Sequence, residues 1–126
     1  MYRALILDHY KHPRNFGILD HPTGKAKLHN TACGDVIEMS IRLSDDGKKI
    51  QDVKFSGEGC AISVASASLL TEEMKGKTIK KAMCMKSADL MNLLGTQLTG
   101  ARTKCAALGL EVFQKALIEA EVANTV

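Results

Sequence analysis

The chain has 126 residues, of which 45% are hydrophobic and 25% are charged, so it holds enough apolar material for one core and we predict a single domain over residues 1–126. Aromatic residues make up 4%, Trp is absent and the net charge is +3, which argues against the stacking platforms and basic surfaces of nucleic-acid binders. No run approaches the roughly 18 apolar residues of a membrane span, and Asp8 comes too early for a signal-peptide core, so we expect a cytoplasmic chain that binds no membrane.

The first half of the chain predicts a short helix followed by a small antiparallel sheet. Apolar residues at positions 4–7 indicate a helix that ends near residues 12–13, and the Asn, Gly and Pro residues of 14–24 are typical of a loop. Residues 25–30 are a candidate strand. Apolar and polar residues alternate from 36 to 43, turn residues follow at 44–48, and a returning strand is predicted at 50–55. His9 and His12 are assigned to surface or capping positions on the first helix.

The second half of the chain predicts helices. They span residues 60–75, about 78–85 and 87–94, and a last helix carries an apolar stripe from Cys105 to Ala120. Strands followed by helices predict an α+β domain, in which a small three-stranded antiparallel sheet has helices packed on one face.

Three of the four cysteines lie at predicted junctions. Cys33 precedes a strand, and Cys60 and Cys105 lie near the first turn of a helix, where unpaired amides stabilise the thiolate that binds metal and attacks sulfur. Asp35 offers an oxygen as a further ligand. In a reducing compartment such cysteines are thiols rather than disulfides. The residue types leave two alternatives open, a Cys/Asp metal site and three buried structural thiols, while Cys84 is assigned to a buried or partly buried structural position.

Four motifs occur in order along nearly the whole chain: DHYKHPRNFG at 8–17, NTACGD at 30–35, GEGCAIS at 57–63 and RTKC at 102–105. In this combination the chain resembles the iron–sulfur cluster assembly scaffolds, the IscU, SufU and NifU N-terminal family. The resemblance implies a SufE/NifU-like fold. It also implies a shallow, solvent-facing site whose ligands are Cys33, Asp35, Cys60 and Cys105.

The resemblance further implies a function. Such a scaffold accepts sulfur from a cysteine desulfurase, binds iron, builds a labile 2Fe-2S cluster and transfers it to recipient apo iron–sulfur proteins. Cys33, Cys60 and Cys105 are then candidate persulfide acceptors, and Asp35 is a harder, weaker ligand that favours cluster release. The protein would be a carrier rather than an enzyme, and a homodimer is left open.

Five lysines between 75 and 86 are assigned to a solvated face, with desulfurase docking as the alternative.

The motifs also depart from the IscU branch. Lys104 stands where that branch usually has His, and residues 94–104 lack the Pro residues of its chaperone-docking segment. Arg102 and Lys104 resemble the SufU branch, and their charge would support an anionic cluster or persulfide; the insertion common in that branch between its second and third Cys is absent. Two alternatives follow. One is a SufU-type zinc-dependent sulfur-transfer protein, and the other is a structural zinc module, because the same four ligands also suit tetrahedral zinc.

Overall fold

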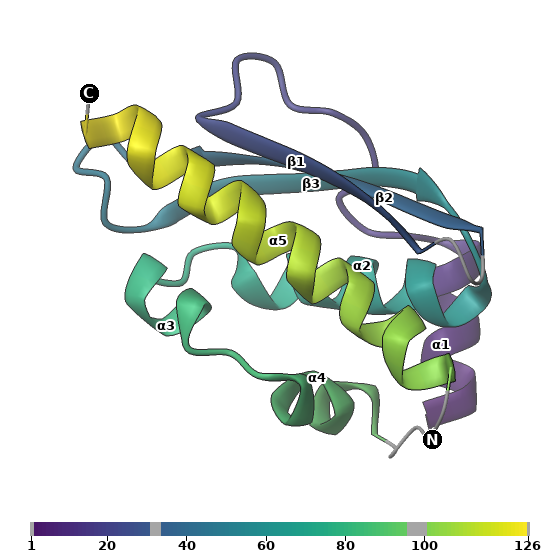
Figure 1. The fold of residues 1–126 in the computed structure, drawn as a ribbon. Coiled ribbons are helices and arrows are strands. Elements are labelled where there is room, and N and C mark those ends of the chain that lie inside the picture. The colour runs from purple at the N-terminus through teal and green to yellow at the C-terminus, as the bar shows by residue number, and fades with distance from the viewer. Residues whose placement is uncertain (1, 31–33, 96–100, 126) are drawn as a thin grey trace.

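The computed structural model describes residues 2–30, 34–95 and 101–125. Within them the chain forms a three-stranded antiparallel sheet in the order β1-β2-β3, with helices on one face, so the predicted α+β architecture is confirmed (Figure 1). None of the helices in these ranges is long and apolar enough to cross a membrane. The elements in chain order are α1 (Tyr2–Lys11), β1 (Gly24–Asn30), β2 (Asp35–Leu43), β3 (Ile50–Glu58), α2 (Ala61–Met74), α3 (Ile79–Met83), α4 (Ser87–Leu94) and α5 (Ala101–Thr125).

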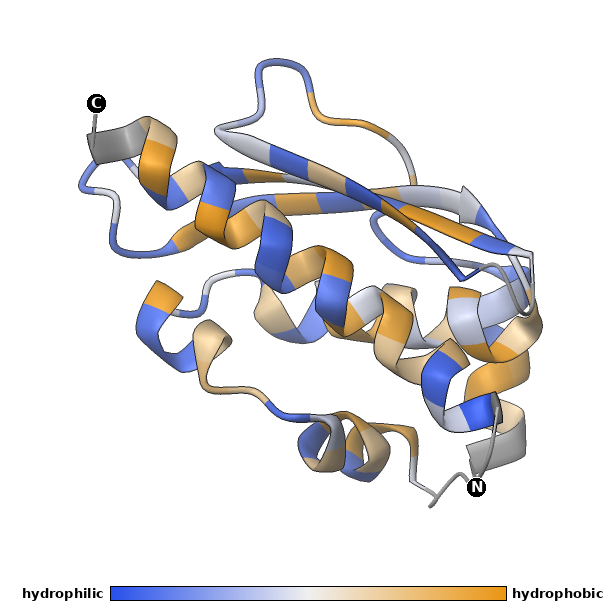
Figure 2. Ribbon diagram, in the orientation of Figure 1, coloured by the Kyte–Doolittle hydropathy of each residue, from blue (hydrophilic) through white to orange (hydrophobic). Residues whose placement is uncertain are grey.

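The central strand β2 shows why the predicted alternation forms a sheet. Ile37, Met39 and Ile41 are fully buried on the face that α2 and α5 cover; of the two residues between them, Glu38 is half-buried and Ser40 is buried. In Figure 2 hydrophobic and hydrophilic stretches also follow one another along α5, as expected of a helix with one buried face. Strand β3 continues three residues beyond the predicted end at Phe55, so it carries the chain directly to the start of α2.

Helix α5 packs with its backbone close to two neighbouring elements. A Cβ added at Gly109 of α5 would lie 3.3 Å from the Cα of Ala67 in α2. A Cβ added at Gly24 of β1 would lie 2.5 Å from the carbonyl oxygen of Ala116 in α5. These glycines therefore allow α5 to lie directly on the sheet and on α2, which fixes where its N-terminal turns stand.

The surface position expected for His9 is wrong, because helix α1 lies against α2 and turns His9 inward. His9 is 3% exposed, and its Nδ1 lies 2.7 Å from the Oγ of Ser68 in α2. The same Oγ accepts a hydrogen bond from the backbone N–H of Arg14 at 2.8 Å. Burial, aided by the nearby Arg14 charge, lowers the pKa of His9 below its ordinary value. His12 is exposed, as expected.

The lowered pKa of His9 predicts that the metal-free protein loses stability in mild acid. As the pH falls below about 6.5, the unfolded chain takes up a proton on this side chain while the folded chain does not, so unfolding is favoured until the pH reaches the folded-state pKa. The free energy of unfolding is measured in urea between about pH 7 and 5.5. Replacing His9 with Gln should make it fall less steeply with falling pH, by up to about 1.4 kcal/mol per pH unit. Equal slopes in the wild type and the His9→Gln variant would contradict the prediction.

Candidate metal centre

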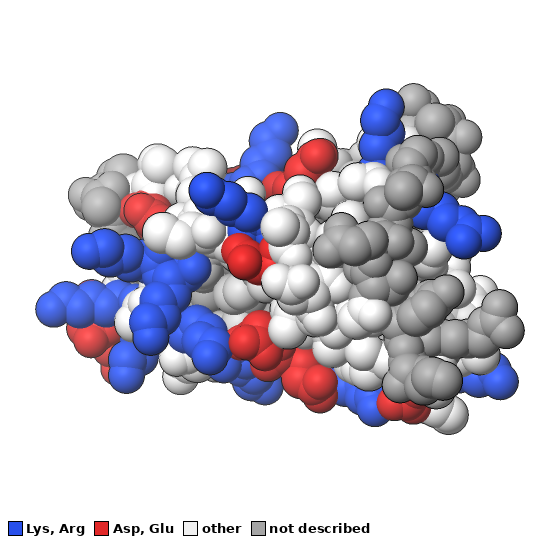
Figure 3. Space-filling model, turned by 90° about the horizontal axis from the view of Figure 1, so that it is seen from below, with Lys and Arg blue, Asp and Glu red and all other residues white. Residues whose placement is uncertain are grey.

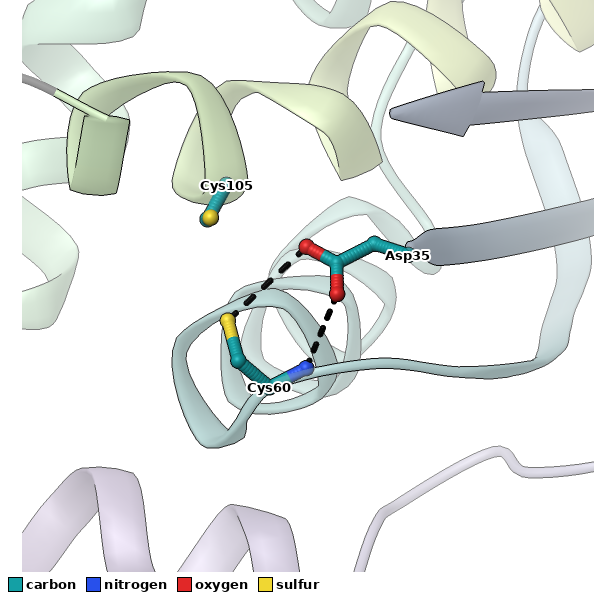
Figure 4. Close-up of side chains that lie close together, drawn as sticks. All are labelled: Asp35, Cys60 and Cys105. Carbon is teal, nitrogen blue, oxygen red and sulfur yellow. Dashed lines mark hydrogen bonds between the residues drawn. The ribbon is translucent and has the colours of Figure 1, made fainter. Parts of the chain in front are cut away.

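Asp35, Cys60 and Cys105 meet at one end of the sheet, where β2 begins and where α2 and α5 start (Figure 4). One carboxylate oxygen and the two Sγ atoms all lie within 4.8 Å of one another. Sheet pairing and the packing of α5 bring these residues together from distant parts of the sequence. Cys33, the fourth residue expected at this site, lies outside the described residues.

The carboxylate of Asp35 is held from two sides by α2. Its Oδ1 accepts a hydrogen bond from the backbone N–H of Cys60 at 3.0 Å, and its Oδ2 accepts one from the Ser63 hydroxyl at 2.5 Å. The Sγ of Cys60 lies 3.8 Å from Oδ2, and Figure 4 shows both contacts between Asp35 and Cys60. Asp35 is 1% exposed. Because both oxygens have donors, the buried charge is stabilised and its orientation toward the thiols is fixed.

Two glycines before Cys60 make this approach possible. Gly57 has φ +146°, and a Cβ there would lie 2.0 Å from the carbonyl oxygen of Val36. A Cβ at Gly59 would lie 2.6 Å from Oδ1 of Asp35. Only a residue without a side chain lets β3 and the start of α2 come this close to Asp35. Gly57 is therefore required for the close pairing of β3 with β2, and Gly59 for the close approach of Asp35.

The two described cysteines differ in their helical positions. Cys60 is the N-cap of α2, with extended backbone and no side-chain capping bond, so it stands where helix amides favour a negative charge. Cys105 is the fifth residue of α5. Cys105 therefore lies beyond the first turn of its helix, whereas Cys60 directly precedes the first turn of α2.

The expected solvent-facing site is only partly open. Cys60 is exposed, whereas Cys105 is 4% exposed because it belongs to the apolar stripe of α5. Among the described members, the structure therefore presents one thiol to solvent and encloses the other beside Asp35. Arg102 and Lys104 are exposed in the first turn of α5, just before Cys105.

Ser63 is the residue that the sequence reasoning missed. It is fully buried, and its hydroxyl contacts Asp35, the Sγ of Cys60 at 3.5 Å and the carbonyl oxygen of Cys105 at 3.2 Å. Its spacing of three residues from a helix N-cap was the available signal, because side chains at these two positions lie on the same side of the first turn.

A second region lies at the opposite end of α2. A groove of about 570 Å³ contains Cys84, which is exposed, so the buried or partly buried position predicted for it is wrong. Lysines gather around this end of the molecule (Figure 3). The 14 residues of α2 separate the groove from Cys60 by about 20 Å, so it is not part of the thiol cluster. Docking of a desulfurase on these lysines stays a prediction.

A small α+β domain with two thiols and a carboxylate converging at one end of its sheet has the donor set of a metal-binding or sulfur-carrying domain. The chain belongs to the NifU-like N terminal domain family, whose sequence profile matches residues 1–125.

Similar proteins include both branches suggested by the motifs. The chain is 37% identical to the zinc-dependent sulfurtransferase SufU of Bacillus subtilis, over 98% of this chain and 94% of that protein. It is 33% identical to the iron–sulfur cluster assembly scaffold protein IscU of Escherichia coli K12, over 94% and 92% of the two chains. Among solved structures, a candidate SUF-system scaffold from Fervidobacterium islandicum is similar with a TM-score of 0.73 and 28% identity, covering 90% of this chain and 93% of that one.

Proposed function

We propose that this chain is an iron–sulfur cluster assembly scaffold, which accepts sulfur from a cysteine desulfurase, binds iron, builds a labile 2Fe-2S cluster and transfers it to recipient apo iron–sulfur proteins. The observation that carries the proposal is the convergence of Asp35, Cys60 and Cys105 within 4.8 Å in a member of the NifU-like family. Scaffold relatives at 33% and 36% identity support the same function.

The donor set suits this cargo. Thiolates from Cys60 and Cys105 are soft ligands of the kind that hold iron–sulfur clusters and zinc, and Asp35 adds a harder oxygen. In this proposal Cys33, which lies between β1 and β2 in the sequence, is the fourth ligand. A cluster held by three thiolates and one carboxylate has one weaker bond, and that bond is where release begins.

Sulfur delivery requires an accessible thiolate, and Cys60 is the exposed cysteine of the described cluster. Its thiolate would attack the outer sulfur of the desulfurase persulfide, form a new S–S bond and release the enzyme's cysteine thiolate, so no oxidant is consumed. Cys33 and Cys105 remain candidate acceptors. Arg102 and Lys104 supply positive charge on α5 for the persulfide or cluster. The cytoplasm, where thiols stay reduced, is the proposed compartment, and a homodimer stays a prediction.

A second function, zinc-dependent sulfur transfer, is favoured by one observation. The Bacillus subtilis relative bearing that name is 37% identical over nearly the whole chain. The same four ligands would hold one zinc ion in tetrahedral geometry, masking the thiols until the desulfurase partner binds.

Metal and sulfide content separates these two functions. The protein is purified without oxygen, and is then offered ferrous iron, cysteine, a cysteine desulfurase and a thiol reductant, because persulfide sulfur must gain two electrons to become the sulfide of a cluster. Iron and acid-labile sulfide in comparable amounts, with visible charge-transfer bands, are expected of the scaffold. Zinc retained in a colourless protein that raises desulfurase turnover would instead establish sulfur transfer. Unfolding on zinc chelation, with no persulfide on any Cys, would leave a structural zinc module.

Replacing Asp35 with Ala is expected to slow cluster transfer by about tenfold, because it removes the weaker oxygen ligand from an otherwise all-thiolate site. Transfer from the reconstituted protein to an apo iron–sulfur acceptor is followed by the acceptor's visible absorption. The matched control is Asp45→Ala, in the exposed turn between β2 and β3, which should leave the rate unchanged. An unchanged rate in the Asp35 variant would contradict the role given to this carboxylate.

A further inference from the structure

The Ser63 hydroxyl lies between groups from all three elements of the thiol cluster. Its Oγ is 2.5 Å from Oδ2 of Asp35 in β2, 3.2 Å from the carbonyl oxygen of Cys105 in α5 and 3.5 Å from the Sγ of Cys60 at the start of α2. Ser63 is fully buried, so water does not compete for these contacts.

A hydroxyl has one proton and donates it to one acceptor at a time. The short distance to Asp35 and the negative charge of a carboxylate make this the preferred acceptor. The carbonyl of Cys105 is a second acceptor at 3.2 Å, which the proton reaches by rotation of the hydroxyl about its C–O bond while Oγ stays in place. Ser63 can therefore release Asp35 without leaving its own buried proton unpaired.

We propose that Ser63 is a positioning residue that keeps the bond between Asp35 and the cargo metal weak. In the metal-free protein the Ser63 hydroxyl donates to Oδ2 of Asp35. When that oxygen binds metal, the hydroxyl donates to the Cys105 carbonyl instead. Metal binding thus replaces the strong hydrogen bond to Asp35 with the weaker one to the Cys105 carbonyl. When the metal leaves, the strong hydrogen bond to Asp35 forms again. This inference rests on the proposed function, in which Asp35 is a ligand.

Replacing Ser63 with Ala should then raise metal affinity. The variant leaves Oδ2 of Asp35 without its Ser63 donor in the metal-free protein, and a bound metal supplies the missing partner. Oδ1 still accepts the backbone N–H of Cys60, so the carboxylate keeps its orientation. We expect zinc to bind about tenfold more tightly to Ser63→Ala than to the wild type, and the metal-free variant to melt at a lower temperature.

The same helix offers a matched control. Ser66 is also fully buried, and its hydroxyl has no hydrogen-bond partner among the described residues. Ser66→Ala makes the same chemical change one turn further along α2, without a contact to Asp35. It should leave zinc affinity unchanged. A second control repeats Ser63→Ala in an Asp35→Ala background, where the affinity gain should disappear because the two residues act through one contact.

The test is a competition titration of Zn²⁺ against a chromophoric chelator, with thermal unfolding of each metal-free protein. A tenfold gain in Ser63→Ala that is absent in both controls establishes the inference. An unchanged affinity, or a ten- to hundredfold loss as expected for a purely orienting partner, overturns it. A gain that persists without Asp35 overturns it too. If the wild type binds neither zinc nor a cluster, both the proposed function and the inference fail; if it binds, the Ser63 result tests the inference alone.

Discussion

Replacing Cys60 with Ser is expected to abolish cluster reconstitution and to weaken zinc binding by at least about a hundredfold. A serine hydroxyl keeps its proton at neutral pH and is a poor ligand for soft metals, so the site loses its exposed thiolate. Cys60 is the N-cap of α2, a position where Ser is among the preferred residues. The substitution should therefore leave α2 intact, and the loss should be specific to metal binding.

Cys84 provides the matched control for this variant. It is also exposed, but it lies in the groove beside α3 rather than in the thiol cluster. Cys84→Ser should reconstitute with the full yield of visible absorption and bind zinc as the wild type does. Cys33→Ser should behave like Cys60→Ser if Cys33 is the fourth ligand. Full cluster yield in both the Cys33 and Cys60 variants would refute the scaffold assignment.

Gly57→Ala is expected to lower the free energy of unfolding by about 3 kcal/mol or more. Two costs combine at this position: the backbone has φ +146°, and the new Cβ would lie 2.0 Å from the carbonyl oxygen of Val36. Because Gly57 pairs with Ile37 in the sheet, relief of the contact requires β3 to move away from β2. The measurement is urea unfolding of the metal-free protein.

A second glycine serves as a reference without a steric contact. Gly76, after the end of α2, has φ +88°, but a Cβ added there would meet no atom within 4 Å beyond its immediate chain neighbours. Gly76→Ala should therefore cost about 1 kcal/mol, from backbone conformation alone. The larger loss expected at Gly57 therefore combines the contact with Val36 and the less favourable φ of +146°. Similar losses in both would show that the sheet accommodates the methyl group at position 57.

The sheet and the helices could be predicted because their signals are local. Alternation between residues 36 and 43 and the glycine after residue 94 are visible within a few positions, and both mark real boundaries. The thiol cluster could not be derived in this way. Cys60 and Cys105 are 45 positions apart, and their spacing alone did not separate ligands from structural thiols. Their grouping came from the resemblance to a family.

The errors have a common physical origin in tertiary packing. The sequence around His9 is typical of a surface position. His9 is buried because α1 packs on α2, where its ring nitrogen contacts the Ser68 hydroxyl. Cys105 belongs to the apolar stripe of α5, so the packing of that helix buries a thiol that the resemblance placed in a solvent-facing site. Ser63 belongs to a run of small residues, and only the position of Asp35 gives its hydroxyl a charged partner.

The contact between Gly109 and Ala67 has a consequence for engineering. Gly109 follows Cys105 by about one turn of α5, and Ala67 follows Cys60 by about two turns of α2. This pair of small residues acts as a spacer that sets the span between the two thiols. A larger residue at position 109 or 67 would push α5 away from α2, and this would widen the distance between the Sγ atoms of Cys60 and Cys105 without changing either cysteine.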